Sequence, residues 1–270
     1  MKIALTFTLL IISITSYSQK IILGTIDNRQ TGLPLQYVNV GFIDRGIGTV
    51  SKIDGTFLLK VNSDLSSIDS LLVSMIGYKS QKYSIDNLFS DTLKILLEPE
   101  TFSLKEIIIK PKNIKNIGSI STSKKLGIYW GSQSSLGGEV GIPLKIKEKS
   151  SKINGFKLHV ITNNWDSIKY RLHVYSIKDG LPCEDYLKQN RFISIKDSTG
   201  IVSFDLSDFN IIVDSDVILS LELLETFGNE DGLIRISAGL TGNVFSRYAS
   251  QDKWTKNKGV HLGMETQISY

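Results

Sequence analysis

The loop sequence TNNWDS, residues 162–167, brings together the side chains that a sugar-binding site requires. An indole ring can stack on the apolar face of a pyranose, while amide and carboxylate groups bond the surrounding hydroxyls. We therefore expect a ligand-binding site with Trp165 as the stacking ring and Asn163, Asn164 and Asp166 as polar partners. The alternative is a polar turn beside aromatic side chains that fill a core. Further rings are available for a platform: Tyr129, Trp130, Tyr170, Tyr175 and Trp254.

Two histidines flank this loop at nearly equal distances along the chain. If residues 156–177 form a hairpin, His159 and His173 lie across from one another on one face of it. Facing imidazoles can bind a metal ion when a third ligand is present. The sequence places no such ligand beside them, so we favour an ordinary cross-strand pair and no metal.

The stretch GIGTVS, residues 46–51, approximates the glycine pattern that binds the pyrophosphate of a dinucleotide. That pattern requires a helix after the glycines, because the phosphate accepts hydrogen bonds from the free N–H groups at the helix start. Asp54, Gly55 and a run of β-forming residues follow instead, which is typical of a hairpin turn. We therefore predict that these glycines serve turns.

The remaining reactive side chains form no catalytic set. Cys183 is the one cysteine, and the negative charges of Glu184 and Asp185 beside it disfavour a reactive thiolate. The acidic loops at residues 205–210 and 228–232 offer fewer than the about six to eight oxygen ligands that calcium takes, so we predict turns. Neither a nucleophile elbow, a P-loop nor a zinc-peptidase motif occurs. We predict no catalytic residue, no cofactor and no enzymatic activity.

The segments that position these residues are predicted to be strands almost throughout. Apolar residues recur with period two or in short runs, separated by Gly, Asp, Asn and Ser clusters at about the 8–12 residue spacing of β-sandwiches. A short turn at residues 85–89 is the best helical candidate. With 270 residues, 41% of them hydrophobic, the chain is long enough for two cores. The sequence therefore predicts an all-β protein of two domains.

Residues 117–270 predict the second of these domains. About ten strand-like runs with alternating faces favour a jelly-roll-like β-sandwich built as two packed sheets. Alternation alone does not distinguish a sandwich from a membrane barrel, but several runs carry charges on both faces or are too short to span a bilayer. We therefore predict the sandwich.

A specific pattern covers the first half of the chain. A glycine in the first strand is followed by a Thr-Gly-x-Pro-Leu turn, a Val-x-Val strand, an Asp-Gly-x-Phe turn and an Ile-Gly-Tyr turn. With these motifs in this order, the chain resembles the carboxypeptidase-regulatory-like domain of exported and outer-membrane proteins from Bacteroidetes-type bacteria. The matching positions are Gly24, Thr31, Gly32, Pro34, Leu35, Val38, Val40, Gly46, Thr49, Asp54, Gly55, Phe57, Ile76, Gly77 and Tyr78.

The resemblance implies a seven-stranded prealbumin-like β-sandwich over residues 19–100. It implies no peptidase activity, because catalysis in relatives belongs to a separate zinc carboxypeptidase domain. Residues 104–112, LKEIIIKPK, resemble the connector that leads in many relatives into a TonB-dependent transporter. The chain beyond this connector is too short for a plug and a transporter barrel, so transport itself is not implied.

The packing expected within this domain follows from residue spacing. Phe57, Leu59 and Val61 alternate after the Asp54-Gly55 turn and are predicted to face the core. Gly77 is predicted to bend the chain so that Tyr78 covers the edge of that core.

The N-terminal residues match an export signal. Lys2, an apolar run from Ile3 to Ile14 and small polar residues ending at Ser18 follow the order of a signal peptide. The apolar run is shorter than the about 20 residues that span a bilayer. We predict a signal peptide over residues 1–18, no integral membrane span in the mature chain, and no internal disulfide, since there is one cysteine.

The net charge of +4 is too small to indicate nucleic-acid binding. Lysines gather between the two predicted domains without interleaved aromatic residues, which is typical of a solvated connector. We predict a basic linker over residues 101–116.

An exported two-domain chain without catalytic residues predicts a non-catalytic binding or assembly module of the bacterial cell envelope. The expected partner is an envelope protein or a glycan, and not nucleic acid. The expected location is the periplasm or the cell surface, including association with the outer membrane. Two alternatives stay open: an accessory subunit of an outer-membrane TonB-dependent uptake complex, and an enzyme with an unrecognised β-sandwich site.

Overall fold

The computed structural model of the chain describes residues 20–61, 65–89, 92–100, 113–132, 135–196, 198–228 and 232–270. Over these residues the protein is nearly all β, with strands interrupted by short 3₁₀ turns, which confirms the predicted fold class. The predicted signal peptide at residues 1–18 and most of the predicted linker, residues 101–112, lie outside the described residues. Within the described ranges, every helical segment is too short to reach across a bilayer.

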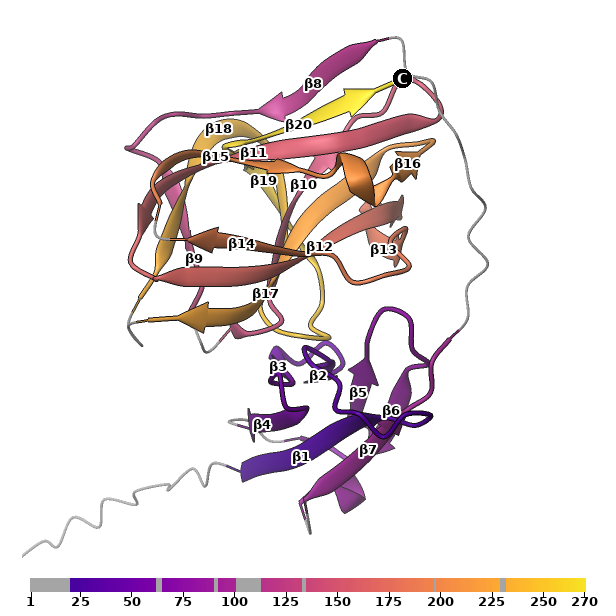
Figure 1. Cartoon of the computed structure of the whole chain (residues 1–270). Helices are drawn as coiled ribbons and strands as arrows, with labels where there is room; N and C mark the ends of the chain where they lie inside the picture. The colour runs from indigo at the N-terminus through magenta and orange to yellow at the C-terminus, as the bar shows by residue number, and fades with distance from the viewer. Residues whose placement is uncertain are drawn as a thin grey trace, which may run out of the picture.

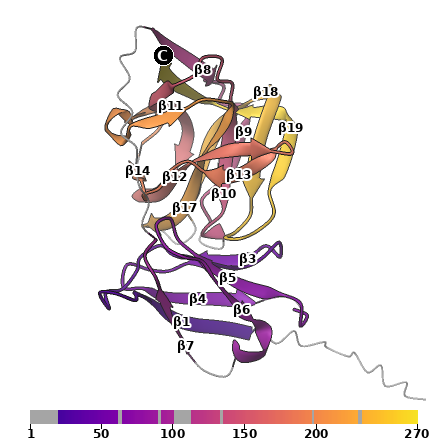
Figure 2. The same ribbon diagram turned by 90° about the vertical axis from the view of Figure 1, so that its right-hand side faces the viewer.

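The first sandwich packs two sheets face to face, drawn in indigo and purple in Figures 1 and 2. The sheets have the orders β4-β1-β7 and β3-β2-β5-β6. Phe57, Leu59 and Val61 point into the core between them and are at most 3% exposed, as their spacing predicts. The strands are β1 Lys20–Asn28, β2 Asn39–Phe42, β3 Ile47–Val50, β4 Thr56–Val61, β5 Ser70–Ser74, β6 Gln81–Ser84 and β7 Leu93–Leu97.

Two predicted turns of this sandwich are confirmed. Gly77 has a φ of +88°, and after it Tyr78 packs against the core, where its hydroxyl accepts a hydrogen bond from Asn28 Nδ2 at 3.1 Å. A 3₁₀ turn, η1, covers Ile85–Asn87 within the predicted helical candidate.

The second sandwich is built from the strands after β7, in pink to yellow in Figure 1. Its strands belong to one sheet whose main path is β13-β12-β17-β10-β18-β11-β20-β8. The bounds are β8 Ile114–Ser119, β9 Gly127–Trp130, β10 Glu139–Leu144, β11 Ser151–Asn163, β12 Ser167–Lys178, β13 Leu181–Asp185, β14 Phe192–Lys196, β15 Gly200–Asp205, β16 Ile211–Val213, β17 Val217–Phe227, β18 Ile234–Arg247, β19 Thr255–Leu262 and β20 Met264–Ser269. Because β8 begins at Ile114, the last residues of the predicted linker are part of a strand.

Strand β18 joins the two layers of this sandwich. Its first half pairs with β11 and its second half with β10. Between the halves a register shift separates Leu240 from Asn243, and Gly242 has a φ of +96°, so the strand bends there. The two layers pack as the predicted sandwich, and β18 links them into one continuous sheet.

The hairpin predicted for residues 156–177 is wrong. Strand β11 pairs with β15, β16, β18 and β20, whereas β12 pairs with β13, β14 and β17. Both strands bury one apolar face in the same core, as Leu158 and Leu172 illustrate. Strands that pack face to face lie in opposite layers, so the short segment between them crosses the sandwich. His159 and His173 therefore lie in different layers and form no pair.

Candidate functional site

A row of charged side chains crosses the outer face of the layer that contains β12, β17, β10 and β18. Arg171 pairs in register with Glu222, Glu222 with Glu139, and Glu139 with Arg247. Successive side chains of a strand alternate between faces, so the neighbours of these residues point into the core. These inward neighbours include Leu172, Leu221 and Val140.

The charges in this row are buried and paired. Glu139, Arg171 and Glu222 are each 0% exposed. Arg171 Nη1 lies 3.1 Å from Glu222 Oε2, and Arg247 Nη2 donates to Glu139 Oε1. Glu139 also accepts from Ser220 Oγ at 2.7 Å, so both of its oxygens are bonded.

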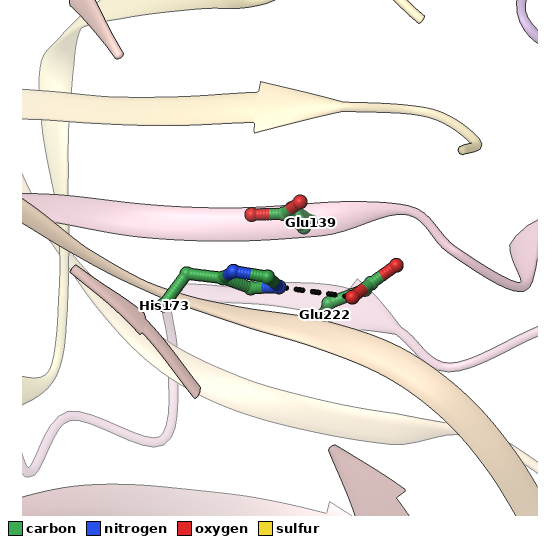
Figure 3. Close-up of side chains that lie close together, drawn as sticks. All are labelled: Glu139, His173 and Glu222. Carbon is green, nitrogen blue, oxygen red and sulfur yellow. Dashed lines mark hydrogen bonds and ion pairs between the residues drawn. The ribbon is translucent and has the colours of Figure 1, made fainter. Parts of the chain in front are cut away.

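His173 lies two residues after Arg171 on β12, on the same face of the strand, and extends the row. Its Nε2 lies 2.9 Å from Glu222 Oε2, which Figure 3 draws as a dashed line. Its Nδ1 lies 2.6 Å from Asp185 Oδ2 at the end of β13. We call the six residues Glu139, Arg171, His173, Asp185, Glu222 and Arg247 the ion cluster.

The charges of the ion cluster balance when His173 is protonated. Burial opposes the charged imidazolium, but Glu139, Asp185 and Glu222 raise the pKa of His173 to about 10. Burial likewise opposes ionised Glu222, but Arg171 and His173 lower its pKa to about 2. Three carboxylates then face two guanidinium groups and one imidazolium, which is the balance that buried charge requires.

Glu139, His173 and Glu222 come close enough to share a metal ion, with ligand atoms within 4.8 Å of one another (Figure 3). The donor set does not fit a metal. A metal-bound histidine needs an unprotonated nitrogen, whereas both nitrogens of His173 contact carboxylates and the pKa is raised. Arg171 and Arg247 add two positive charges beside the same carboxylates.

The cluster also lacks the arrangement of a nucleophile and its base. The hydroxyl of Ser220 donates to Glu139. A serine nucleophile must be reachable by its substrate and bonded to a base that is free to take its proton, whereas Ser220 is 0% exposed and Glu139 is paired with Arg247. The described residues of the cluster are therefore suited to structural pairing.

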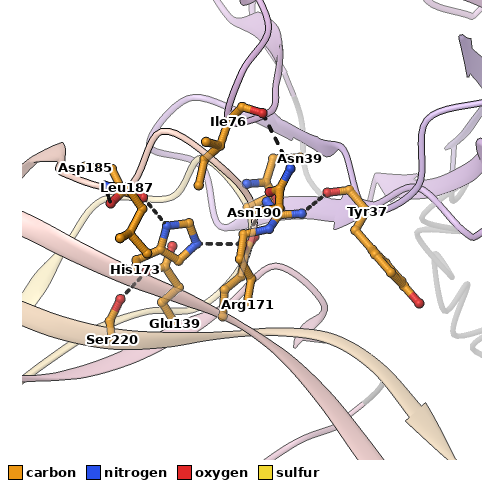
Figure 4. Close-up of polar contacts among 12 residues, drawn as sticks. Tyr37, Asn39, Ile76, Glu139, Arg171, His173, Asp185, Leu187, Asn190 and Ser220 are labelled. Carbon is orange, nitrogen blue, oxygen red and sulfur yellow. Dashed lines mark hydrogen bonds and ion pairs between the residues drawn. The ribbon is translucent and has the colours of Figure 1, made fainter. Parts of the chain in front are cut away.

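The first sandwich contacts the ion cluster at Arg171, as Figure 4 shows. Arg171 Nη2 donates to the backbone carbonyl of Tyr37, and the Tyr37 hydroxyl donates to Glu225 Oε2 at 2.5 Å. Asn190 Nδ2 reaches the carbonyl of Ile76 at 3.5 Å. Tyr37 has a φ of +58°, a conformation that costs a bulky residue about 1–2 kcal/mol. The strained residue, Tyr37, is the one whose carbonyl accepts from the buried guanidinium of Arg171.

A turn of the second sandwich docks against the first between β18 and β19. Ser250 is 0% exposed, and its Oγ donates to Asn39 Oδ1 at 2.9 Å. Gly41 and Gly48 are cross-strand partners on β2 and β3, and a Cβ on either would overlap the carbonyl oxygen of Ser250. We call residues 248–252 the docking turn.

This contact corrects the role predicted for one glycine of the GIGTVS stretch. Gly46 has a φ of +64° and serves a turn, as expected. Gly48 lies inside β3, and its missing side chain makes room for the docking turn.

A groove of ≈ 510 Å³ opens beside the docking turn. Tyr129 of β9 and Tyr248 of the docking turn line it and are 64% and 59% exposed. Trp130, Asp252 and the paired Glu139 and Arg247 line it as well. We call this the junction groove.

The site residues predicted from the TNNWDS loop are brought together, but not as a stacking site. Trp165 is 1% exposed and packs in the core, because the loop crosses between the layers and its ring fills the space there. Its predicted stacking role does not fit this placement. Asn163 Nδ2 donates to the Lys196 carbonyl at 2.9 Å, and its Oδ1 accepts from the Trp165 N–H. Asn164 and Asp166 are exposed, and ligand binding through them stays a prediction.

The rings predicted as a platform are also separated. Tyr170 is buried and lies against Trp130, with ring centroids 4.6 Å apart. Tyr175 contacts Trp254 at 5.6 Å on the outer face of the same layer. Of the predicted rings, Tyr129 and Trp130 line the junction groove.

The structure also places His159, Cys183 and one of the two acidic loops. His159 is 6% exposed on β11, opposite Ile201. Cys183 is exposed on β13. The acidic loop at residues 205–210 forms a turn, as expected: Asp205 accepts from the Ser207 N–H at 2.9 Å just before a 3₁₀ turn at Ser207–Phe209, whereas residues 229–231 of the other loop are not described.

Sequence reasoning missed the ion cluster, although a signal was present. Arg171 and His173 alternate with apolar residues in YRLHV, as Ser220 and Glu222 do in LSLELL. Charges at alternate positions of strongly apolar strands indicate a second buried face when they are of opposite sign on different strands.

Comparison with known proteins bears on the first sandwich. Residues 22–109 match the family model of the CarboxypepD_reg-like domain, which confirms the resemblance predicted from the sequence. None of the curated proteins matches the chain.

Solved structures show weak likeness over most of the chain. The clostridial cysteine protease Cwp84 after propeptide cleavage is 8% identical with a TM-score of 0.43, over 95% of this chain and 72% of that one. The cysteine protease and lectin-like domains of Cwp84, a surface layer associated protein of Clostridium difficile, are 10% identical with a TM-score of 0.40, over 87% and 59%. An infectious bursal disease virus structure, Gx strain, is 11% identical with a TM-score of 0.30, over 93% and 63%. Likeness at this level carries no argument about function.

Proposed function

We propose that this chain, whose residues 22–109 match the CarboxypepD_reg-like domain, is an exported, non-catalytic binding or assembly module of the bacterial cell envelope. Its partner is a glycan or a protein of the envelope. The N-terminal residues MKIALTFTLLIISITSYS support export, since they follow the order of a signal peptide.

The ion cluster is the observation that carries the non-catalytic part of the proposal. It holds the histidine and carboxylates that an enzyme would use, yet both nitrogens of His173 contact carboxylates. Arg171 donates from the same cluster to the first sandwich. A set of charges that is balanced, buried and bonded across the junction stabilises an assembly and leaves no free base.

The junction supports a binding role because it holds the two sandwiches in one arrangement. Tyr37, Asn39 and Ile76 of the first sandwich bond to residues of the second. A surface shared by two fixed bodies can bind a partner without first ordering them, which favours affinity.

Fractionation tests the export step. The full chain with a C-terminal tag is produced in a Bacteroidetes host, and mass spectrometry identifies its first residue in the soluble, periplasmic and membrane fractions. We expect the chain to begin near Gln19 and to leave the cytoplasm. A cytoplasmic chain that keeps residues 1–18 contradicts the proposal.

A sedimentation assay tests binding and separates it from catalysis. Purified residues 19–270 are mixed with isolated envelope fragments, and we expect saturable co-sedimentation. The same sample is assayed for metal content and against hydrolase substrates. Turnover that disappears in His173→Gln would establish the enzyme alternative instead, and one bound metal per chain would contradict the expectation of no metal. Retention that occurs only with fragments containing TonB-dependent transporters would support the uptake-complex alternative.

A further inference from the structure

We propose that the junction groove binds a neutral carbohydrate chain, with Tyr129 and Tyr248 as stacking rings and Asp252 as an acceptor for sugar hydroxyls. This inference rests on the proposed binding function and names its ligand class. The groove volume of ≈ 510 Å³ lies in the range of about 300–1,000 Å³ that is usual for ligand sites.

The two tyrosines offer exposed ring surface at the groove. Tyr129 is 64% exposed and Tyr248 is 59% exposed. An aromatic ring in water favours contact with an apolar surface, and the C–H face of a sugar ring provides one of matching size. Tyrosine also keeps its hydroxyl available for hydrogen bonds at the edge of the same contact.

Local contacts hold the segments that carry the two rings. The guanidinium of Arg235 lies 5.4 Å from the centre of the Tyr129 ring, and two carbonyls of residues 124–125 accept from that guanidinium. The Tyr248 N–H donates to Asp252 Oδ2 at 3.3 Å, inside the docking turn. Little ordering is therefore needed before a ligand stacks, which favours binding.

The charge of the groove selects against an anionic ligand. Arg247 is paired with Glu139, whose side chain is 0% exposed. Asp252 accepts backbone N–H groups from Tyr248 and Lys253, and each carboxylate oxygen retains a further lone pair. With Glu139 and Asp252 against Arg247 in the lining and Arg235 beside the Tyr129 ring, the charges at the groove balance, so it offers no excess positive charge to an anion. A neutral ligand with many hydroxyl donors complements this lining, and a polyanion does not.

A second groove of ≈ 590 Å³ lies over β11, β15 and β20. Its two aromatic side chains, Phe156 and Phe204, stack on each other with centroids 4.7 Å apart. Phe156 is 2% exposed, and the partly exposed Phe204 stacks on it, so the pair offers less free ring face to a sugar than the two tyrosines do. The exposed tyrosines therefore favour the junction groove.

Calorimetry with purified residues 19–270 tests the inference. The probes are neutral oligosaccharides of glucose, mannose, xylose and N-acetylglucosamine, and polygalacturonate serves as the anionic probe. We expect binding of at least one neutral probe and none of polygalacturonate. Tyr129→Ala and Tyr248→Ala should each weaken that binding by about three- to tenfold, since one ring contact is removed.

Matched variants separate stacking from folding. Tyr186 is 39% exposed outside the groove lining, so Tyr186→Ala should bind like the unaltered chain. Tyr129→Phe keeps the ring and should bind within about threefold of it. Thermal melting of every variant checks that the fold is retained.

The outcomes distinguish this inference from the proposed function. If the chain binds envelope fragments but no neutral oligosaccharide, or if the two alanine variants bind unchanged, the groove assignment is overturned and the binding function stands. If polygalacturonate binds more tightly than every neutral probe, the charge argument is overturned. If a neutral probe binds through the tyrosines but the chain stays in the cytoplasm, the groove assignment holds and the envelope proposal fails.

Discussion

The layer formed by β12, β17, β10 and the end of β18 buries both of its faces, with opposite chemistry. Its inner face packs side chains such as Leu172 and Leu221 into the core of the second sandwich. Its outer face carries Glu139, Arg171 and Glu222, which are as fully buried as those leucines, and Arg171 bonds the first sandwich at the Tyr37 carbonyl. Apolar contact is non-directional, whereas buried charge requires each partner in place. The inner face therefore stabilises one sandwich alone, and the outer face is complete only when both are docked.

Removing one charge from the outer face should have the largest effect. Arg171→Met leaves Glu222 buried without its guanidinium and the Tyr37 carbonyl without its donor. We expect the free energy of unfolding, measured in urea, to fall by about 3–5 kcal/mol. Small-angle scattering should also show a larger radius of gyration, because the two sandwiches lose a shared contact.

An exposed pair provides the control for that variant. Lys145 contacts Asp216 at 2.5 Å, and its side chain is 78% exposed. Lys145→Met should change the free energy of unfolding by less than about 1 kcal/mol. If Arg171→Met changed it equally little, the outer face would not be a site of buried pairing.

Truncating the inner face should have a slightly smaller effect of a different kind. Leu221→Ala removes buried hydrocarbon and leaves a cavity, which lowers the free energy of unfolding by about 2–5 kcal/mol. The radius of gyration under native conditions should stay unchanged, because no contact with the first sandwich is lost. An expanded native state in Leu221→Ala would contradict the division between the two faces.

Adding a side chain at Gly48, where the docking turn packs, should weaken the contact between the two sandwiches with little effect on either core. In Gly48→Ala the new methyl overlaps the Ser250 carbonyl, so we expect a loss of about 1–3 kcal/mol and an expanded particle. Gly180→Ala is the matched control, since Gly180 has open space around it and a φ of +76°. Backbone strain alone should destabilise this control without expanding it. Equal scattering curves for both variants would argue against the docking role.

Raising the pH should loosen the outer face more gradually. Burial opposes charged His173, but Glu139, Asp185 and Glu222 raise its pKa from 6.5 to about 10, with Arg171 and Arg247 alongside. The stabilisation is complete below pH 6.5, falls as the pH rises, and is lost as the pH passes 10.

The free energy of unfolding should therefore fall by at most about 1.4 kcal/mol per pH unit above neutrality. Urea titrations at neutral and alkaline pH measure this slope, and His173→Gln should remove most of it. An equal slope in both proteins would assign the pH dependence to other groups.

The strands and turns were predictable because local spacing determines them. Phe57, Leu59 and Val61 needed only alternation after a turn, and Gly77 needed only a conformation that other residues avoid. The choice between a hairpin and a crossing at residues 164–166 depends on which layer receives each strand. Alternation does not contain that information, so the pairing of β11 and β12 was predicted wrongly.

The candidate site was less predictable, because it depends on contacts between distant segments. Trp165 lies among polar loop residues, yet its position between layers buries it. Arg171 and Glu222 reveal a second buried face only once β12 and β17 are known to be neighbours. The sequence predicted that Gly48 serves a turn. The structure shows that its missing side chain makes room for Ser250, far along the chain.

The bond between Ser250 and Asn39 joins residues 211 positions apart. During synthesis the N-terminal sandwich emerges first. It can therefore fold before the docking turn is available to pack against Gly41 and Gly48. The docking turn is synthesised well after the first sandwich, and closing so long a loop carries an entropic penalty. Docking of the two bodies therefore follows folding of the first, and until then the buried Arg171 guanidinium lacks the Tyr37 carbonyl as its partner.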